Sequence, residues 1–231
     1  MRTRALAILG FWLAAVATPA SAARAPVVVE LFTSQGCSSC VKTGDLMADL
    51  AGRPHVLALT FAVDYWDYLG WEDTFAKPEF ADRQRAYLKP LGVRDVYTPQ
   101  VVVDGRLQAA AVDPKAVDKL VKSADHVTSK SPAIMSARGR IAVGSGSSGR
   151  GGYEVWLVRY DPHDQKVVVR KGENRGKTIV EHNVVRELVR LGAWNGKPKS
   201  FHLPKAEDEG LETVVLVQGA HGGPILVARK L

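Results

Sequence analysis

The first half of the chain alternates continuous apolar runs with segments of helical periodicity. Residues 26–33, PVVVELFT, form a valine-rich apolar run that is typical of a strand buried in a parallel sheet. Residues 55–64, HVLALTFAVD, form a second such run. Stretches that predict helices follow these runs and the hairpin described below, over residues 41–52, 79–92 and 113–124.

A hairpin is predicted over residues 96–110, VYTPQVVVDGRLQAA. One strand follows Pro99, Asp104-Gly105 supplies a favoured two-residue turn, and a second strand continues to Ala110. The last helix of this half has Asp113 as its N-cap and Pro114 in its first position. The predicted order of elements up to residue 125 is therefore β-α-β-α-β-β-α.

The pattern of apolar and polar residues changes after a predicted linker at residues 123–133, SADHVTSKSPA. From there to residue 231, short strand-like stretches alternate with turn signals, which predicts a smaller antiparallel β domain. Residues 183–194, NVVRELVRLGAW, fit either a strand or a short helix by periodicity. We predict an α/β protein with a first domain over residues 23–125 and a C-terminal β-rich domain over residues 131–231.

The N-terminus predicts a signal peptide over residues 1–22. Arg2 and Arg4 precede an apolar run at 5–17, and an A-x-A cleavage pattern follows at residues 20–22. The alternative, a membrane anchor, is disfavoured because the run is short for a bilayer span. We therefore expect an exported protein, periplasmic or secreted, with no membrane span in the mature chain.

Charge excludes one class of partner. The formal net charge is +7, and removal of Arg2 and Arg4 with residues 1–22 leaves +7 − 2 = +5. The basic residues are scattered along the chain rather than clustered, so the mild surplus does not indicate a nucleic-acid partner.

The candidate chemistry lies in the two cysteines, Cys37 and Cys40, which follow the first apolar run. A disulfide this short removes little entropy from the unfolded chain, so a purely structural bridge is a weak explanation. If the motif opens a helix, the helix N-terminus favours a Cys37 thiolate, and Cys40 can resolve a mixed disulfide. A static disulfide and half of a zinc site remain as alternatives, although no second Cys or His pair has ligand spacing.

The chain resembles known families in several specific segments. Residues 26–125 resemble a thioredoxin-like domain. The segments ELFTSQGCSSC, VDYWDYLGWEDTFA, RQRAY, VYTPQVVVDG, VWLVRYD and NVVRELVRLGAW are similar to a family of secreted thioredoxin-like proteins that is catalogued as domain of unknown function 1223. That family usually continues the cysteine motif with two prolines, where this chain has Val41 and Lys42.

The resemblance implies a substrate site. In the thioredoxin fold, a proline preceded by a cis peptide bond opens the strand that faces the cysteines. Here that proline is Pro99, and Thr98 before it would offer its backbone groups to a client peptide.

Aromatic and acidic residues follow the second apolar run. Asp64 ends that run, at the sheet edge where we expect the cysteines, so it is a candidate for proton transfer to Cys40. Trp66 and Trp71 are candidates for an aromatic wall that grips the client. Helix capping by Asp64 and ordinary packing of the aromatic rings are the alternatives.

The functional prediction is an exported thiol–disulfide oxidoreductase of thioredoxin-like type that acts on protein disulfides and needs no cofactor. Its partners would be protein thiol or disulfide substrates and an unidentified redox partner. Two alternatives stay open: a periplasmic protein that binds Cu(I) through the two thiolates, and a non-catalytic binding module. The sequence leaves the direction of electron flow and the oligomeric state open.

Overall fold

The computed structural model describes residues 25–124, 131–147, 149 and 151–231. The predicted signal peptide and the middle of the predicted linker lie outside these residues. Within them, no helix is long and apolar enough to cross a membrane. The helical elements are η1 (Ser38–Cys40), α1 (Thr43–Ala51), η2 (Asp67–Leu69), α2 (Pro78–Ala86) and α3 (Pro114–Ala124). The strands are β1 (Val27–Thr33), β2 (Val56–Ala62), β3 (Gln100–Val103), β4 (Leu107–Ala110), β5 (Ile134–Ala137), β6 (Arg140–Val143), β7 (Tyr153–Asp161), β8 (Gln165–Val168), β9 (Thr178–Glu181), β10 (Val184–Trp194), β11 (Lys199–His202), β12 (Glu212–Gly219) and β13 (Ile225–Lys230).

A mixed sheet of eight strands runs through the described part of the chain in the order β13-β12-β7-β10-β2-β1-β3-β4. β1 and β2 are parallel, and β3 is antiparallel to β1. β10 joins β2 through the parallel pair Val184 and Thr60, so strands from the two halves of the sequence share one sheet. The α/β class is as predicted, whereas the boundary at residues 125–131 stays a prediction.

Local sequence rules account for several elements. The Asp113 carboxylate accepts a hydrogen bond from the Ala116 N–H at 3.0 Å, which caps α3 as predicted. The turn between β3 and β4 has positive φ at both central residues, 49° at Asp104 and 60° at Gly105. The open alternative for residues 183–194 is settled, because this stretch forms strand β10.

The continuous apolar run of β1 packs on both faces of the sheet. Val28 and Phe32 belong to a core on the α2 side, together with Phe80. Val29 and Leu31 belong to the opposite core, which α1 and α3 cover. All seven residues of β1 are buried, which is why this strand shows no polar alternation.

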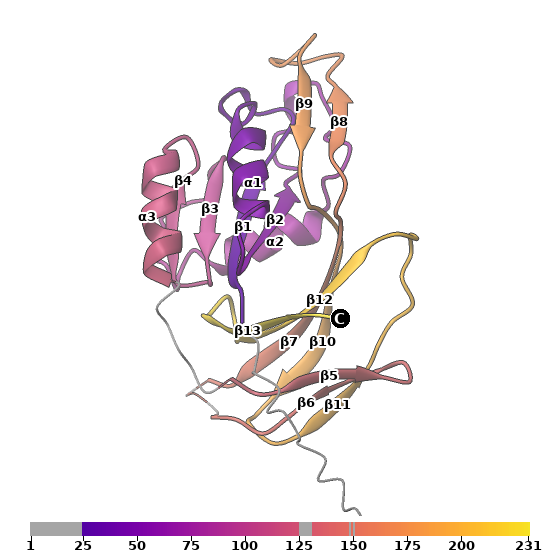
Figure 1. The fold of residues 1–231 in the computed structure, drawn as a ribbon. Coiled ribbons are helices and arrows are strands. Elements are labelled where there is room, and N and C mark those ends of the chain that lie inside the picture. The colour runs from indigo at the N-terminus through magenta and orange to yellow at the C-terminus, as the bar shows by residue number, and fades with distance from the viewer. Residues whose placement is uncertain (1–24, 125–130, 148, 150) are drawn as a thin grey trace, which may run out of the picture.

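Figure 1 shows where the remaining strands lie. The β8–β9 hairpin stands beside α1, away from β7, β10 and β12 in the lower part of the view. Gly44 permits this close approach, since a Cβ at that position would lie 2.4 Å from the Val180 carbonyl oxygen in β9. A segment far along the chain therefore packs against the helix that follows the cysteines.

Candidate functional site

The two cysteines form a disulfide in the turn that follows β1. Their Cα atoms are 5.3 Å apart, and Cys37 is 5% exposed against 2% for Cys40. Cys37 is the N-cap of the short 3-10 helix η1, and α1 begins only at Thr43. This differs from the prediction that the motif opens α1 itself, because Lys42 interrupts the helix with φ −93° and ψ 1°.

A serine hydroxyl lies against the first sulfur. The Ser39 Oγ is 3.3 Å from the Cys37 Sγ, and the hydroxyl is the donor because a disulfide sulfur carries no proton. In the reduced protein, the same hydroxyl would donate to the thiolate and favour its ionisation. Both serines of the motif are exposed, but only Ser39 makes this contact within the described residues.

We expect Ser39→Ala to raise the pKa of the Cys37 thiol, since a hydrogen bond to the charged form is lost. Ser38→Ala, a neighbouring exposed serine, is the matched control and should leave that pKa unchanged. The measurement is the pH dependence of thiolate absorbance or of iodoacetamide alkylation in the reduced protein. Equal values for the two variants would refute a role for the Ser39 hydroxyl.

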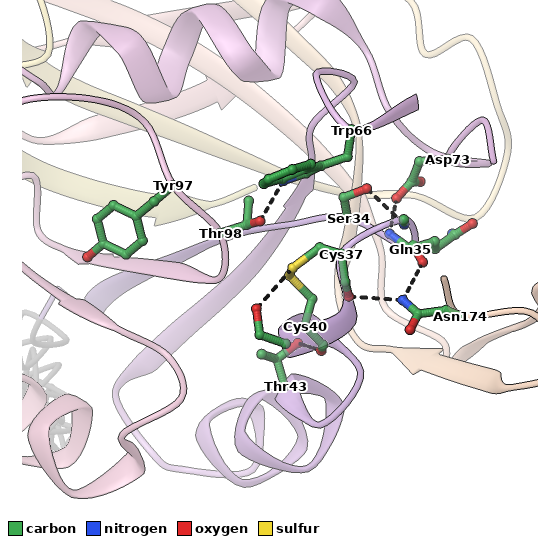
Figure 2. The surroundings of a disulfide bond; sticks show 12 residues. Ser34, Gln35, Cys37, Cys40, Thr43, Trp66, Asp73, Tyr97, Thr98 and Asn174 are labelled. Atoms are coloured by element: carbon green, nitrogen blue, oxygen red, sulfur yellow. Dashed lines mark hydrogen bonds between the residues drawn. A yellow bond between two sulfur atoms is a disulfide. The ribbon is translucent and has the colours of Figure 1, made fainter. Parts of the chain in front are cut away.

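The Thr98-Pro99 peptide bond is cis, as predicted. The Trp66 Nε1–H donates to the Thr98 Oγ1 at 2.7 Å, and both side chains lie beside Cys37 in Figure 2. Within the described residues, the backbone N–H and C=O of Thr98 form no hydrogen bond. The ring of Trp66 stacks on Tyr68, which is 77% exposed. A half-exposed surface with free backbone groups therefore adjoins the disulfide.

The other two predicted residues have different surroundings. The Trp71 Nε1–H donates to the Gln35 Oε1 at 3.0 Å, and its Cβ packs near Gly172 in the loop after β8. The Asp64 carboxylate forms no hydrogen bond or ion pair within the described residues. A client contact for Trp71 and proton transfer by Asp64 both stay predictions.

Gln35, just before the cysteines, is the centre of a hydrogen-bond network that the sequence alone did not indicate. Gln35 is fully buried, and its backbone N–H donates to the Asp73 Oδ2 at 2.6 Å. Its side-chain Nε2 donates to the Glu181 Oε2 at 3.0 Å, and its Oε1 accepts hydrogen bonds from Trp71 and Thr74. Gln35 thereby links the cysteine turn to the aromatic connector and to β9.

Asn174 donates two hydrogen bonds to the backbone of the same turn. It is fully buried in the loop between β8 and β9, and its Nδ2 donates to the Gln35 carbonyl at 2.8 Å and to the Cys37 carbonyl at 2.9 Å. Figure 2 shows both bonds converging on the backbone of the turn. No local sequence signal marks this asparagine, because its neighbours are the glycines and charged residues of an ordinary hairpin tip.

Two buried carboxyl groups, those of Asp73 and Glu181, accept hydrogen bonds from Gln35. Burial raises the pKa of Asp73 and of Glu181, and the charge of Asp73 raises the pKa of Glu181 further. Asp73 accepts backbone hydrogen bonds from Gln35 and Phe75, which favour its charged form. Glu181 accepts only the Gln35 amide bond within the described residues. Burial and the neighbouring Asp73 charge therefore favour the neutral form of the Glu181 carboxyl group, because both raise its pKa.

No group of three or more histidine, cysteine or acidic side chains within the described part of the chain could hold a metal ion. What the residues near the cysteines offer is hydrogen-bond donors and a protonatable carboxyl group rather than additional soft ligands. The arrangement is suited to thiol chemistry at Cys37.

Comparison with known proteins places the chain in a family. No curated protein sequence matches it. The crystal structure of the protein AGR_C_4864 from Agrobacterium tumefaciens is similar, with a TM-score of 0.71 and 29% sequence identity, over 90% of this chain and 95% of that one. Residues 28–218 match the family described as "Protein of unknown function (DUF1223)". The chain therefore belongs to the DUF1223 family.

Proposed function

We propose that this protein is an exported thiol–disulfide oxidoreductase of thioredoxin-like type that acts on protein disulfides. The observation that carries the proposal is the Cys37–Cys40 disulfide beside Thr98, whose backbone N–H and C=O have no partner within the described residues. A client strand could pair with these groups and so bring its own sulfur to the disulfide. Export is proposed because residues 1–22 fit the pattern of a signal peptide and because a disulfide suits an oxidising compartment.

Oxidation of a client dithiol proceeds in two exchange steps. A client thiolate attacks the Cys37 sulfur, the bond between the two cysteine sulfurs breaks, and Cys40 leaves and takes up a proton. The second client thiolate then attacks the client sulfur of the mixed disulfide and releases Cys37, so the client is oxidised and the protein is reduced. An unidentified disulfide partner reoxidises the protein, and the reverse sequence reduces a client disulfide.

The order of the two cysteines follows from their surroundings. Cys37 is the more exposed of the two, and its sulfur accepts the Ser39 hydrogen bond. Cys40 is buried at the end of η1, and its carbonyl accepts a hydrogen bond from Thr43 at 2.8 Å. We therefore assign the attacked sulfur to Cys37 and the resolving sulfur to Cys40.

We expect Cys40→Ser to accumulate mixed disulfides with clients, because Cys37 attacks but nothing resolves the adduct. Cys37→Ser should trap no client, and both variants should lose insulin-reduction or refolding activity. Trapped adducts are counted on non-reducing gels after alkylation of free thiols, with the wild type as control.

A static disulfide predicts the opposite outcome. Neither variant would then differ from wild type in trapping or activity, and the reduction potential of the Cys37–Cys40 couple would lie far below the poise of its compartment. That result would reject the proposed function and favour a non-catalytic binding module.

A further inference from the structure

The loop between β8 and β9 concentrates positive charge beside the disulfide. Residues 169–177, VRKGENRGK, which we call the basic loop, hold four basic residues and one acidic residue, a formal charge of +4 − 1 = +3. All four basic side chains are exposed: Arg170, Lys171, Arg175 and Lys177. The loop is an exception to the scattered distribution of basic residues along the chain, and the exchange reaction proposed above gives these charges no role.

Buried contacts attach the basic loop to the cysteine turn. Asn174, in the middle of the loop, is fully buried and donates to the Cys37 carbonyl at 2.9 Å, as Figure 2 shows. The Lys177 Nζ donates to the Asn174 Oδ1 at 2.9 Å, so a single side chain separates this ammonium group from the Cys37 backbone. Within the loop, the Gly176 N–H donates to the Val169 carbonyl at 2.8 Å. The positive charges therefore lie on an ordered backbone that is bonded to the turn of the attacked sulfur.

The basic loop also packs against the aromatic connector, residues 64–76 between β2 and α2. A Cβ at Gly172 would lie 3.2 Å from the Leu69 carbonyl oxygen and 3.4 Å from the Trp71 Cβ. The same connector carries Trp66, whose indole N–H donates to Thr98. The loop and the surface at Thr98 are thus joined through one segment, so a polypeptide at Thr98 lies within reach of the loop.

The basic side chains have no acidic partners of their own. The side chains of Arg170, Lys171 and Arg175 form no hydrogen bond or ion pair within the described residues. The Lys177 contact is to the neutral amide of Asn174. The loop therefore presents unneutralised guanidinium and ammonium groups, which pair favourably with carboxylates.

The neighbouring elements do not cancel this charge. The aromatic connector is acidic, with Glu72 exposed and Asp64 and Asp67 partly exposed, and none of the three pairs with the basic loop within the part of the chain that the structure describes. At the start of α1, Lys42 and Asp45 are exposed and have opposite charges. An acidic segment is attracted to the loop and repelled by the connector, so it docks against the loop.

We propose that the basic loop docks an acidic segment of the client polypeptide next to the client's reacting cysteines; this inference rests on the proposed function. A polypeptide is the partner because it brings a sulfur to the disulfide that the loop adjoins, whereas a lipid surface brings none. Attraction between the segment and the loop raises the association rate of acidic clients above that of neutral ones. The loop thereby sets which clients the disulfide meets.

The test uses the reduced protein and three cyclic peptide disulfides of equal length, with cysteines flanked by glutamates, by glutamines or by lysines. The second-order rate constant of each is measured at ionic strengths of about 0.01 M and about 0.5 M. At the lower value, the glutamate peptide should react about 10-fold faster than the glutamine peptide, and the lysine peptide should be slowest. At the higher value the three rate constants should converge, because salt screens exposed charges. Equal rate constants for the glutamate and glutamine peptides at low ionic strength overturn the proposal.

The variant Lys171→Glu with Arg175→Glu reverses two exposed charges of the basic loop, so the ratio of the glutamate to the glutamine rate constant should fall to about 1 or below. The matched control is Lys115→Glu with Lys119→Glu, the same change in net charge at exposed positions of α3, which lies away from the β8–β9 hairpin in Figure 1. The control should keep most of the wild-type ratio. Because each ratio is taken within one protein, a change in the reactivity of Cys37 cancels. Equal ratios in the two double variants contradict the assignment of the effect to the loop.

A binding measurement separates this inference from the proposed function. A cysteine-free glutamate peptide, followed by fluorescence anisotropy at an ionic strength of about 0.01 M, should bind wild type and the α3 variant and should not bind the loop variant. If wild type exchanges all three peptides equally, the inference fails and the proposed function stands. If wild type exchanges with none of them yet binds the glutamate peptide through the loop, the proposed function fails and the docking surface stands. Absence of binding and of exchange overturns both.

Vesicles of phosphatidylglycerol and phosphatidylcholine test the other class of acidic partner. At an ionic strength of about 0.15 M, wild type should sediment with the vesicles no more than the loop variant does. Sedimentation that depends on the loop, without a preference for the glutamate peptide, would assign the loop to a membrane surface and reject the client segment.

Discussion

Arg83→Met is expected to lower the free energy of unfolding by about 3–5 kcal/mol, because it leaves the Glu30 carboxylate buried without its counter-charge. Glu30 in β1 is fully buried, and the side chain of Arg83 in α2 is 4% exposed. The Arg83 Nε donates to the Glu30 Oε1 at 2.6 Å, and its Nη2 donates to the Gln218 Oε1 at 3.1 Å. The pair thereby ties α2 both to β1 and to β12.

The size of the effect follows from what methionine keeps and what it removes. Methionine fills similar space among the rings that surround the guanidinium, Phe61 and Trp156. It removes the charge and the hydrogen bonds, so the loss is electrostatic rather than a cavity. Tyr87 still donates to Glu30, which softens the penalty but supplies no positive charge.

Urea unfolding followed by tryptophan fluorescence measures the effect of Arg83→Met. The control is Arg85→Met on the same helix, where an exposed pair with Asp82 is broken and a change of less than about 1 kcal/mol is expected. A double variant, Glu30→Gln with Arg83→Met, should recover part of the loss because no charge is then stranded. Equal midpoints for Arg83→Met and Arg85→Met would show that the buried pair contributes nothing.

Elements governed by local chemistry were predictable from the sequence. The apolar run of β1 lacks alternation because both faces of the sheet are covered there. Asp104-Gly105 forms the expected hairpin turn, and Asp113 forms the expected cap of α3. In each case, the residues that decide the structure are neighbours in the chain.

Contacts between distant residues were not predictable in this way. The link from Gln35 to Glu181 spans 146 positions, and that from Gln35 to Asn174 spans 139. Neither periodicity nor spacing encodes such a pairing. The continuity of the sheet was missed for the same reason, since β10 meets β2 at a single parallel pair, Val184 and Thr60.

Gly44→Ala distinguishes local sequence rules from contacts between distant residues. The two predict changes of opposite sign in the free energy of unfolding. By helix propensity alone, replacing a glycine inside α1 with alanine should stabilise the protein by about 1 kcal/mol. The structure predicts the reverse, since the new Cβ would lie 2.4 Å from the backbone oxygen of Val180. That oxygen cannot rotate away as a side chain would, so α1 and β9 must separate. We expect a net loss of about 1–3 kcal/mol in the free energy of unfolding.

Gly52→Ala is the matched control at the other end of α1. Its φ of −77° suits any residue, and an added Cβ would make only an ordinary 3.5 Å contact with the Ala48 oxygen, so a gain of about 0.4–1 kcal/mol is expected. Both variants are compared with wild type by urea unfolding and by the rate of dithiothreitol reduction. Because β9 and its loop carry Glu181 and Asn174, separation from α1 should also change the reduction rate in Gly44→Ala and leave it unchanged in Gly52→Ala. Stabilisation by both substitutions would mean that the β8–β9 hairpin does not pack closely against α1 at Gly44. The position of Asn174 beside the disulfide turn would then not depend on that contact.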